Sequence, residues 1–348
     1  MDKKPQPLVS VCISAYNVKQ VLGAALGSVL AQTYKNIEVI LIDNGSTDGT
    51  YDVARSVVDE RLRCIRFPSN IGGYQAMNEA IKMSKGEFVA VYHSDDIYEP
   101  TIVEKEVNYL QTYPQVGAVF CLDHFMDYEG RIFGGASLPR EFLGREWLVY
   151  EEVFPFLLRN KNILFCCPTF MTRRKTLEVV GLFNPEKYGI GADLEMWIRI
   201  LRKFPVGILN ERLMRYRVGR NQWSNRYNYL RTDPEASFFV LDDYLEQDQW
   251  LQRLSPTDLV EYTFHRCDDN TFRAANWVIR GNTPNALELL KQPYPWRTLL
   301  TNIQRRKLRV LLLRMLIYSG LTLGAVRPLA RFLIWSEYRG PKYKTRAE

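Results

Sequence analysis

Residues 37–50 read Ile-Glu-Val-Ile-Leu-Ile-Asp-Asn-Gly-Ser-Thr-Asp-Gly-Thr, an apolar run that ends in a cluster of turn-forming residues. The run predicts a buried strand over 37–42, and the polar residues after it predict a turn that caps a helix. The same alternation recurs on both sides of this stretch. Short apolar runs predict further strands over 8–14, 62–67 and 87–92, and helical spacing predicts helices over 21–32, 51–58 and 74–84.

Strands that alternate with helices indicate βαβ units, and these predict an α/β fold with a mostly parallel sheet and helices on both faces. In such a sheet, ligands bind at the carboxyl ends of the strands, where loops and helix N-termini meet. The polar loops expected at that edge are 15–17, 43–48, 70–73 and 93–96. The pattern becomes mixed to about residue 225, with strands expected over 116–122 and 206–209 and helices over 146–158 and 193–203.

The loop His93-Ser94-Asp95-Asp96 brings two adjacent carboxylates to this edge. Mg²⁺ and Mn²⁺ prefer carboxylate and phosphate oxygens, so one carboxylate can hold a cation that also bridges two phosphates. Such a cation offsets the charge that grows on a departing diphosphate. Taken alone, however, the loop is more typical of a solvated turn that caps the next helix.

Four motifs in a fixed order change that interpretation. They resemble the signatures of the family 2 glycosyltransferases, inverting enzymes of the GT-A fold, and the resemblance covers residues 8–224. It implies a Rossmann-like GT-A domain over 1–227, with a nucleotide-sugar half over about 1–100 and an acceptor half over about 101–227. The motifs are VSVCISAYN at 9–17, QTYKNIEVILIDNGSTDGT at 32–50, NIGGYQAMNEAI at 70–81 with Gly-Glu-Phe at 86–88, and HSDDIYEP at 93–100.

The resemblance implies that Tyr16 stacks on the nucleobase and that Asp43 or Asn44 hydrogen-bonds its edge. The structural alternatives are a core aromatic for Tyr16 and a turn former for Asp43. Because the family often has two acids where this chain has Asp43-Asn44, the nucleotide stays open: a UDP-sugar is expected first, with dTDP- and GDP-sugars as alternatives. The implied nucleotide-sugar-binding residues are Ser14, Tyr16, Asn17, Asp43, Asn44, Asn70, Gly72, His93 and Ser94.

The same resemblance implies that Asp95 is the direct ligand of Mg²⁺ or Mn²⁺. His93 stands where the family usually has its first Asp, and Asp96 is a secondary candidate that we expect to orient the loop. Inverting transfer also needs a base on the acceptor hydroxyl, because one displacement inverts the anomeric carbon. Asp193, in the segment 189–199, matches the family's base.

The sequence around Asp193 departs from the family pattern, and its acidic residues also have a structural interpretation. Ala192 replaces the first acid of the family's pair, and Glu195 matches a further acidic position as a secondary candidate. Alternatively, Asp193 only caps a helix and Glu195 is solvated.

The family-like segments 164–174 and 181–184 are expected to border the acceptor pocket. Because Gly219 stands where relatives often have His, Arg217 or Arg220 would have to contact the diphosphate.

The net charge of +7 is concentrated at the C-terminus. Residues 291–348 hold 13 Lys and Arg against 2 Asp and Glu, a net of +11, and the first 290 residues carry a net of −4. We expect 228–348 to form a helical, basic extension. Its longest uncharged stretch, 315–326, has 12 residues, which is too short to span a bilayer. The extension is therefore expected either to lie on an anionic membrane surface, near lipid-linked acceptors, or to pack on the catalytic domain or a homodimer partner.

Six cysteines without CxxC spacing predict buried, reduced thiols with neither zinc nor disulfides, and no signal-peptide pattern is seen. We therefore expect a cytoplasmic protein, peripheral on the inner face of the cytoplasmic membrane, and no nucleic-acid partner. The prediction is a nonprocessive inverting glycosyltransferase that acts on a glycan or lipid-linked acceptor in polysaccharide or cell-envelope synthesis. A processive synthase lacks its QxxRW motif here, and a dinucleotide oxidoreductase lacks GxGxxG. A catalytically silent GT-A-like module, which only binds a nucleotide sugar or acts as a scaffold, is the alternative that Ala192 and Gly219 suggest.

Overall fold

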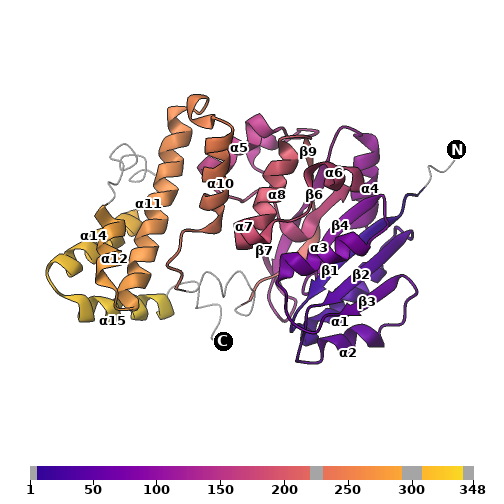
Figure 1. The fold of residues 1–348 in the computed structure, drawn as a ribbon, viewed down its shortest axis with the longest axis horizontal. Helices are drawn as coiled ribbons and strands as arrows, with labels where there is room; N and C mark the ends of the chain where they lie inside the picture. The colour runs from indigo at the N-terminus through magenta and orange to yellow at the C-terminus, as the bar shows by residue number, and fades with distance from the viewer. Residues whose placement is uncertain (1–5, 220–229, 292–307, 340–348) are drawn as a thin grey trace. The chain divides into compact units, whose positions relative to one another are not determined.

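The computed structural model describes residues 6–219, 230–291 and 308–339 (Figure 1). The chain divides into two compact units. Unit 1 comprises residues 1–154 and 162–222, and unit 2 comprises residues 155–161 and 223–348. The boundary expected at residue 227 lies outside the described residues.

Unit 1 is built around one nine-stranded sheet with the order β3-β2-β1-β4-β8-β6-β9-β5, in which β7 pairs with β6. The neighbours β3, β2, β1 and β4 are parallel, as are β6 and β9, whereas β8 runs antiparallel between β4 and β6. The predicted mostly parallel α/β sheet is therefore confirmed. The strands are β1 Val9–Ala15, β2 Ile37–Asp43, β3 Leu62–Arg66, β4 Phe88–His93, β5 Ile97–Tyr98, β6 Ala118–Met126, β7 Ile132–Gly135, β8 Phe170–Arg173 and β9 Val206–Arg217.

Alternate residues of the strands supply the cores on the two faces of this sheet. Val11 and Ile13 of β1 pack in one cluster with Leu22 of α1 and Val107 of α4. On the other face, Phe120 of β6 lies edge-on to Trp197 of α8. Helices therefore cover both faces, as predicted (Figure 1). The helices of unit 1 are α1 Lys19–Leu30, α2 Thr50–Ser56, α3 Gly73–Met83, α4 Ile102–Thr112, α6 Arg174–Val180, α7 Pro185–Tyr188 and α8 Ala192–Leu201.

The helix predicted over 146–158 is observed as α5 Tyr150–Asn160, which connects the two units. Its start was predicted four residues too early, because Leu148 forms a β-bridge with Val206 instead of joining the helix. Short 3₁₀ turns lie at Arg140–Phe142, Cys167–Thr169, Gly189–Gly191 and Trp250–Gln252, labelled η1 to η4.

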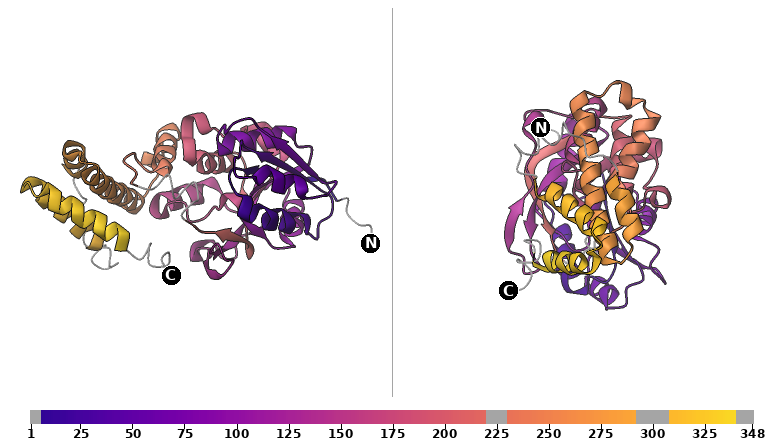
Figure 2. Two further views of the ribbon diagram at one scale, coloured as in Figure 1. Left: turned by 90° about the horizontal axis from the view of Figure 1, so that it is seen from below. Right: turned by 90° about the vertical axis from the view of Figure 1, so that its left-hand side faces the viewer.

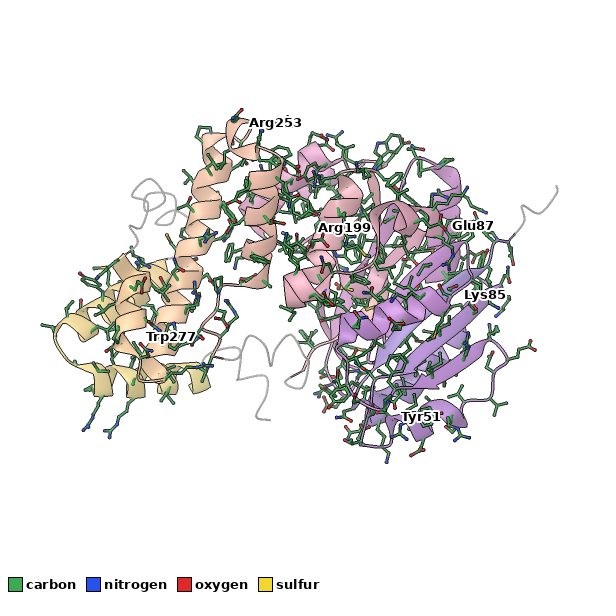
Figure 3. The ribbon with its side chains drawn as sticks, in the orientation of Figure 1. Tyr51, Lys85, Glu87, Arg199, Arg253 and Trp277 are labelled. Atoms are coloured by element: carbon green, nitrogen blue, oxygen red, sulfur yellow. The ribbon has the colours of Figure 1, made fainter. Side chains whose placement is uncertain are left out.

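Unit 2 is helical, as predicted for the C-terminal extension. Its core contains Ala274, Val278, Ile317 and Leu333, and Trp277 packs against it (Figure 3). The views in Figure 2 show α14 and α15 lying beside α11 and α12. Within the described ranges, no helix has both the length and the apolar character that a bilayer crossing requires. The helices are α10 Ala236–Gln247, α11 Pro256–Ile279, α12 Thr283–Lys291, α14 Leu308–Thr322 and α15 Val326–Arg339.

Candidate active site

The carboxyl ends of β1, β2 and β4 meet at one edge of the sheet. Ala15 is in register with Asp43, and Ser14 is in register with His93. The loops that follow these strands therefore begin side by side, and they contain most of the residues predicted to bind the donor. Parallel strands favour this arrangement because their carboxyl ends point the same way.

Asn17 joins the first two of these loops. Its backbone is left-handed, with φ 53°, and its Oδ1 accepts a hydrogen bond from the N–H of Thr47 at 3.0 Å. Its own N–H donates to Ser46 Oγ at 3.0 Å. The neighbouring Tyr16 stays 44% exposed. Asn17 thus shapes the loop, and the Tyr16 ring is left available to stack on a planar ligand.

Asp43 is fully buried at the end of β2. Its Oδ1 accepts from the N–H of Ser46 at 3.3 Å, and Arg66 Nε lies 3.4 Å from Oδ2. Among the described residues, Oδ2 has no hydrogen-bond partner. Because this buried oxygen has an ion pair with Arg66 but no hydrogen bond, it is suited to accept a hydrogen bond from a ligand.

Asn44 and Asn70 connect the second and third loops. Asn44 Nδ2 donates to Asn70 Oδ1 at 3.0 Å, and Asn44 Oδ1 accepts from the N–H of Ile71 at 3.0 Å. Asn70 Oδ1 also accepts from the N–H of Gly72 at 2.8 Å. These two side chains, predicted to bind the nucleotide, thus hold the loop that leads into α3. The loops are so close that a Cβ on Gly45, which has φ +74°, would lie 2.5 Å from the backbone of Ser69.

The fourth loop holds an acidic cluster. One ligand atom from each of His93, Asp95 and Asp96 lies within 4.8 Å of the others. Asp96 is fully buried; its Oδ1 accepts from the N–H of Arg217 at 2.8 Å, and its Oδ2 has no hydrogen-bond partner in the described parts of the chain. Ser94 Oγ donates to the carbonyl of Ser14 at 3.0 Å and fixes the loop to β1.

Electrostatics in the cluster favour a bound cation. Burial, and then the charge of Asp95, raises the pKa of Asp96 well above its usual value. Burial lowers the pKa of His93, an effect that Asp95 opposes. A neutral imidazole beside two carboxyl groups is a donor set that suits a divalent ion.

Arg217 braces the acidic loop from β9. Its Nε donates to the carbonyl of Asp95 at 2.7 Å, and its Nη1 donates to the carbonyls of Asp127 and Tyr128 at 3.2 and 3.0 Å. Only 5% of Arg217 is exposed. The guanidinium expected to bind phosphate is thus bonded to backbone carbonyls, and Arg220 lies outside the described residues. At Gly219, a Cβ would meet the Tyr128 ring at 1.8 Å, so any larger side chain there requires Tyr128 to move.

Asp193 lies half-buried in the first turn of α8. Its Oδ1 accepts from the N–H of Leu194 at 2.6 Å, and its carboxylate accepts a hydrogen bond from the Tyr74 side chain. Burial raises the pKa of Asp193 to about 6, although both hydrogen bonds act to lower it. A carboxylate with this pKa is ionised at neutral pH and is still basic enough to take up a proton.

Glu195, two residues further along, is buried rather than solvated. Its carboxylate pairs with Arg199 at 2.9 and 2.8 Å. Arg199 also donates to the carbonyls of Val180 and Leu182. Glu195 therefore holds Arg199 against the segment before the base.

The buried Cys167 lies between the acidic loop and Asp193, and the partly buried Tyr216 lies beside the acidic loop. Burial, and then the charges of Asp193 and Asp96, raises the pKa of the Cys167 thiol. Burial, Cys166 and the charges of Asp96 and Asp95 raise the pKa of Tyr216. Because the charges of both Asp193 and Asp96 raise the pKa of Cys167, we infer that Asp193 and the acidic loop lie near the same buried region.

Several residues of this region had no role in the sequence-based prediction. Tyr74 and Asn78 lie in the third motif, but their partners are more than 100 residues away, at Ile190 and Phe183. No local pattern reveals such contacts. The six cysteines form no disulfide with one another; four are buried as predicted, whereas Cys64 and Cys166 are partly exposed.

Comparison with known proteins gives a consistent result. The family model described as glycosyl transferase family 2 matches residues 10–181. The Escherichia coli protein WfaP, a UDP-Glc:alpha-D-GlcNAc-diphosphoundecaprenol beta-1,3-glucosyltransferase, is 40% identical over 196 residues, which cover 56% of this chain and 71% of WfaP. TuaG of Bacillus subtilis, a glycosyltransferase named for teichuronic acid biosynthesis, is 29% identical over 223 residues, 63% of this chain and 82% of TuaG.

Two solved structures share the fold. The mannosyltransferase PcManGT from Pyrobaculum calidifontis, in complex with GDP-Man and Mn²⁺, aligns with a TM-score of 0.52 at 19% identity and covers 96% of this chain and 88% of its own. Residues 1–349 of TarS from S. aureus, in complex with UDP-GlcNAc, align with a TM-score of 0.51 at 15% identity, over 81% of this chain and 90% of that one.

Proposed function

Because the chain belongs to glycosyl transferase family 2 and is a glycosyltransferase, we propose that it transfers a sugar from a nucleotide diphosphate to an acceptor hydroxyl with inversion at the anomeric carbon. The observation that carries the proposal is the cluster of His93, Asp95 and Asp96 at the ligand edge of the sheet, together with the contacts of Tyr74, directly after the third loop, with Ile190 and Asp193. It supports a site in which an acidic, cation-binding loop and a separate carboxylate face one substrate. Inverting transfer in a single displacement needs a base on the acceptor hydroxyl and no covalent intermediate, and a cation stabilises the departing diphosphate.

The cation is assigned to the acidic loop. The residues fit a divalent ion, because two carboxyl groups and an imidazole converge there and Asp96 Oδ2 has no hydrogen-bond partner in the described chain. We assign Asp95 as the direct ligand, with His93 and Asp96 beside it. When bound, Mg²⁺ or Mn²⁺ supplies positive charge that stabilises the departing diphosphate. The Mn²⁺ in the PcManGT complex supports the same choice.

Asp193 is proposed as the base. As the acceptor oxygen bonds to the anomeric carbon, the bond from that carbon to the diphosphate oxygen breaks, and the hydroxyl proton passes to the Asp193 carboxylate. Because the proton leaves as the new bond forms, no positive charge builds up on the acceptor oxygen. With a pKa of about 6, Asp193 is mostly ionised at pH 7 and can accept this proton.

The nucleotide sugar is proposed to bind over the first three loops. Its nucleobase would stack on Tyr16, and an N–H on the edge of the nucleobase would donate a hydrogen bond to Asp43 Oδ2. We propose a UDP-sugar, and the name of WfaP supports this choice. The same name supports a lipid-linked acceptor, and TuaG supports a place in cell-envelope glycan synthesis. dTDP- and GDP-sugars are outcomes of the test.

The test is a panel of UDP-, dTDP- and GDP-sugars, scored for acceptor-dependent release of the nucleoside diphosphate with Mn²⁺ or with EDTA. Turnover with one donor and its loss in EDTA are expected. Donor binding without turnover by any donor would favour the silent module instead. Turnover that persists in EDTA would remove the cation from the proposal.

We also propose that unit 2 brings the enzyme to the inner face of the cytoplasmic membrane as a peripheral protein. On α14, Leu312, Met315 and Leu316 are 61%, 58% and 44% exposed, and Arg327 and Arg331 of α15 are exposed. Residues 292–336 contain no Asp or Glu. Exposed apolar side chains and arginines, in a stretch of sequence that lacks acidic residues, match the chemistry of an anionic lipid surface.

Not every arginine of this region belongs to that surface. Arg314 is buried, and its guanidinium donates to Thr271 Oγ1 and to the carbonyl of Leu290 at 3.2 and 2.8 Å. Arg305 and Arg306 lie outside the described residues.

In flotation with phosphatidylglycerol vesicles, the full chain should float and a variant with Leu312, Met315 and Leu316 changed to Ser should not. Equal flotation would reject the lipid surface, and dissociation of a dimer by the same changes would assign the surface to a second copy.

A further inference from the structure

Tyr74 links the donor side of the site to the base. It lies in the first turn of α3, directly after the loop that Asn44 and Asn70 hold. Its ring stacks on Phe183 with the centroids 5.2 Å apart. Its hydroxyl lies 3.4 Å from the carbonyl of Ile190, and it also hydrogen-bonds the Asp193 carboxylate.

Asn78, one turn further along α3, strengthens this link. Its Nδ2 donates to the carbonyl of Phe183 at 2.8 Å, and its Oδ1 accepts from the N–H of Phe183 at 3.0 Å. Both bonds are buried. The segment that leads to Asp193 is therefore fixed to α3 at Phe183, and the Tyr74 hydroxyl is held at the base by contacts on the ring and on the backbone.

We propose that Tyr74 is a positioning residue for the base, whose hydroxyl orients Asp193 and keeps it hydrogen-bonded both before and after it takes the proton of the acceptor. The proposal rests on the proposed function, in which Asp193 is that base. The family resemblance gave Tyr74 no role, and the role proposed here follows from contacts between residues that lie far apart in the sequence.

The chemistry follows from the two acceptors beside one hydroxyl. When Asp193 is ionised, the Tyr74 O–H donates to the carboxylate. When Asp193 has taken a proton, its own O–H can donate to the Tyr74 oxygen, and the phenolic hydrogen turns to the carbonyl of Ile190. Tyr74 keeps its own proton throughout, so the number of protons in the pair changes only by the one from the acceptor.

Among the groups around Asp193, Tyr74 is the side chain whose hydrogen bond lowers the pKa of this carboxyl. Tyr74 faces it from α3, Cys167 from η2 and the N–H of Leu194 from its own helix, and Glu195 is paired with Arg199. Burial raises the pKa of Asp193, and the Leu194 and Tyr74 hydrogen bonds lower it. Burial and the charge of Asp193 raise the pKa of Tyr74 well above its usual value, so the phenol stays protonated at neutral pH. Loss of the hydroxyl must therefore raise the pKa of the base.

The experiment compares Tyr74→Phe with the wild type in the full chain. The phenyl ring keeps the Phe183 contact, so the fold should be retained. We expect the acidic limb of the pH–rate profile to move up by about half to one pH unit, the value of one hydrogen bond to a charged group. Transfer should fall about two- to fivefold at pH 6 and much less at pH 8.5, with the KM for the donor unchanged.

Tyr34→Phe is the matched control. This variant also loses a buried hydroxyl. In the wild type that hydroxyl donates to the carbonyl of Pro7 at 2.6 Å, at the amino-terminal edge of the sheet and away from the ligand edge. Its profile should keep the wild-type limb. An equal loss at every pH in Tyr74→Phe, or an unshifted limb, would overturn the proposal.

A second measurement needs neither donor nor acceptor. The carboxyl carbon of Asp193, followed by ¹³C NMR between pH 4 and 8, should titrate about half to one unit higher in Tyr74→Phe. Tyr74→3-fluorotyrosine, which keeps the hydroxyl and makes it a stronger donor, should move the titration down. Equal titration curves in all three proteins would overturn the proposal. If Asp193→Asn retained transfer, the assignment of the base would fail, whereas an inactive Asp193→Asn with an unshifted Tyr74→Phe would reject only the role of Tyr74.

Discussion

Asp193→Asn should abolish transfer and at the same time stabilise the fold at neutral and alkaline pH. The pKa of Asp193 is raised from 3.8 to about 6, chiefly by burial, so ionisation of this group costs folding free energy. The difference of about two pKa units corresponds to about 3 kcal/mol, which we reduce to about 2 kcal/mol because the side chain is only half-buried. Asn has nearly the same shape and carries no charge.

The sign of the effect depends on pH in a defined way. Below about pH 4, Asp193 is protonated in both the folded and the unfolded state, so wild type and variant should have similar stability. Between about pH 4 and 6 the unfolded chain releases this proton and the folded chain keeps it, so wild-type stability falls as pH rises. Above about pH 6 the difference should stay near 2 kcal/mol in favour of the variant.

Urea unfolding of both proteins at pH 4 and pH 8 measures this difference. Asp52→Asn is the control, because Asp52 is an exposed carboxylate in the first turn of α2, and its removal should change stability by less than about 0.5 kcal/mol at either pH. A gain for Asp193→Asn that is equal at both pH values, or no gain at pH 8, would refute the argument from burial. Loss of function with gain of stability is typical of a group that is kept for chemistry.

Three further predictions concern the surroundings of the base and the cation. Asn78→Ala should lower the free energy of unfolding, measured in urea, by about 2–3 kcal/mol, because the N–H and the carbonyl of Phe183 both lose their partner. The control Asn108→Ala, on the exposed side of α4, should change it by less than about 0.5 kcal/mol, and similar values for the two variants would contradict the prediction. Arg217→Lys should raise the Mn²⁺ concentration for half-maximal transfer about tenfold, since one ammonium cannot bond three carbonyls in a fork, and an unchanged metal titration would reject the bracing role. Wild-type kcat/KM should be about tenfold lower at pH 5 than on its plateau, and a flat profile across pH 6 would disagree with the pKa of Asp193.

The sequence predicted the elements that have strong local patterns. The apolar run at 37–42 and its counterparts became β2, β1, β3 and β4, because buried parallel strands appear as continuous β-rich runs. β5 and β8, with 2 and 4 residues, are too short to show a period, and their pairing is antiparallel and non-local. β9 was expected to end at residue 209, but it continues to Arg217 through Glu211 and Arg212, whose charges hide the strand pattern.

For the site, sequence identified the residue types and the loops but not the partners of each side chain. Asn17 and Asn44 were assigned to the nucleotide, yet their amide groups are hydrogen-bonded to neighbouring loops. Arg217 was assigned to the diphosphate, yet its guanidinium binds carbonyls. An amide or a guanidinium can bond a ligand or a backbone equally well, so its choice depends on tertiary contacts that no local pattern contains.

The division of labour between cation and base is the central claim, and calorimetric titration of the donor selected by the panel, paired with transfer assays of the same samples, tests it most directly. Asp193→Asn should bind the donor with wild-type affinity in Mn²⁺ and transfer less than about 1% as fast, because it lacks only the proton acceptor. Asp95→Asn should lose the part of the donor affinity that depends on Mn²⁺. Transfer by Asp193→Asn at more than about a tenth of the wild-type rate, or a full Mn²⁺ dependence in Asp95→Asn, would contradict the account.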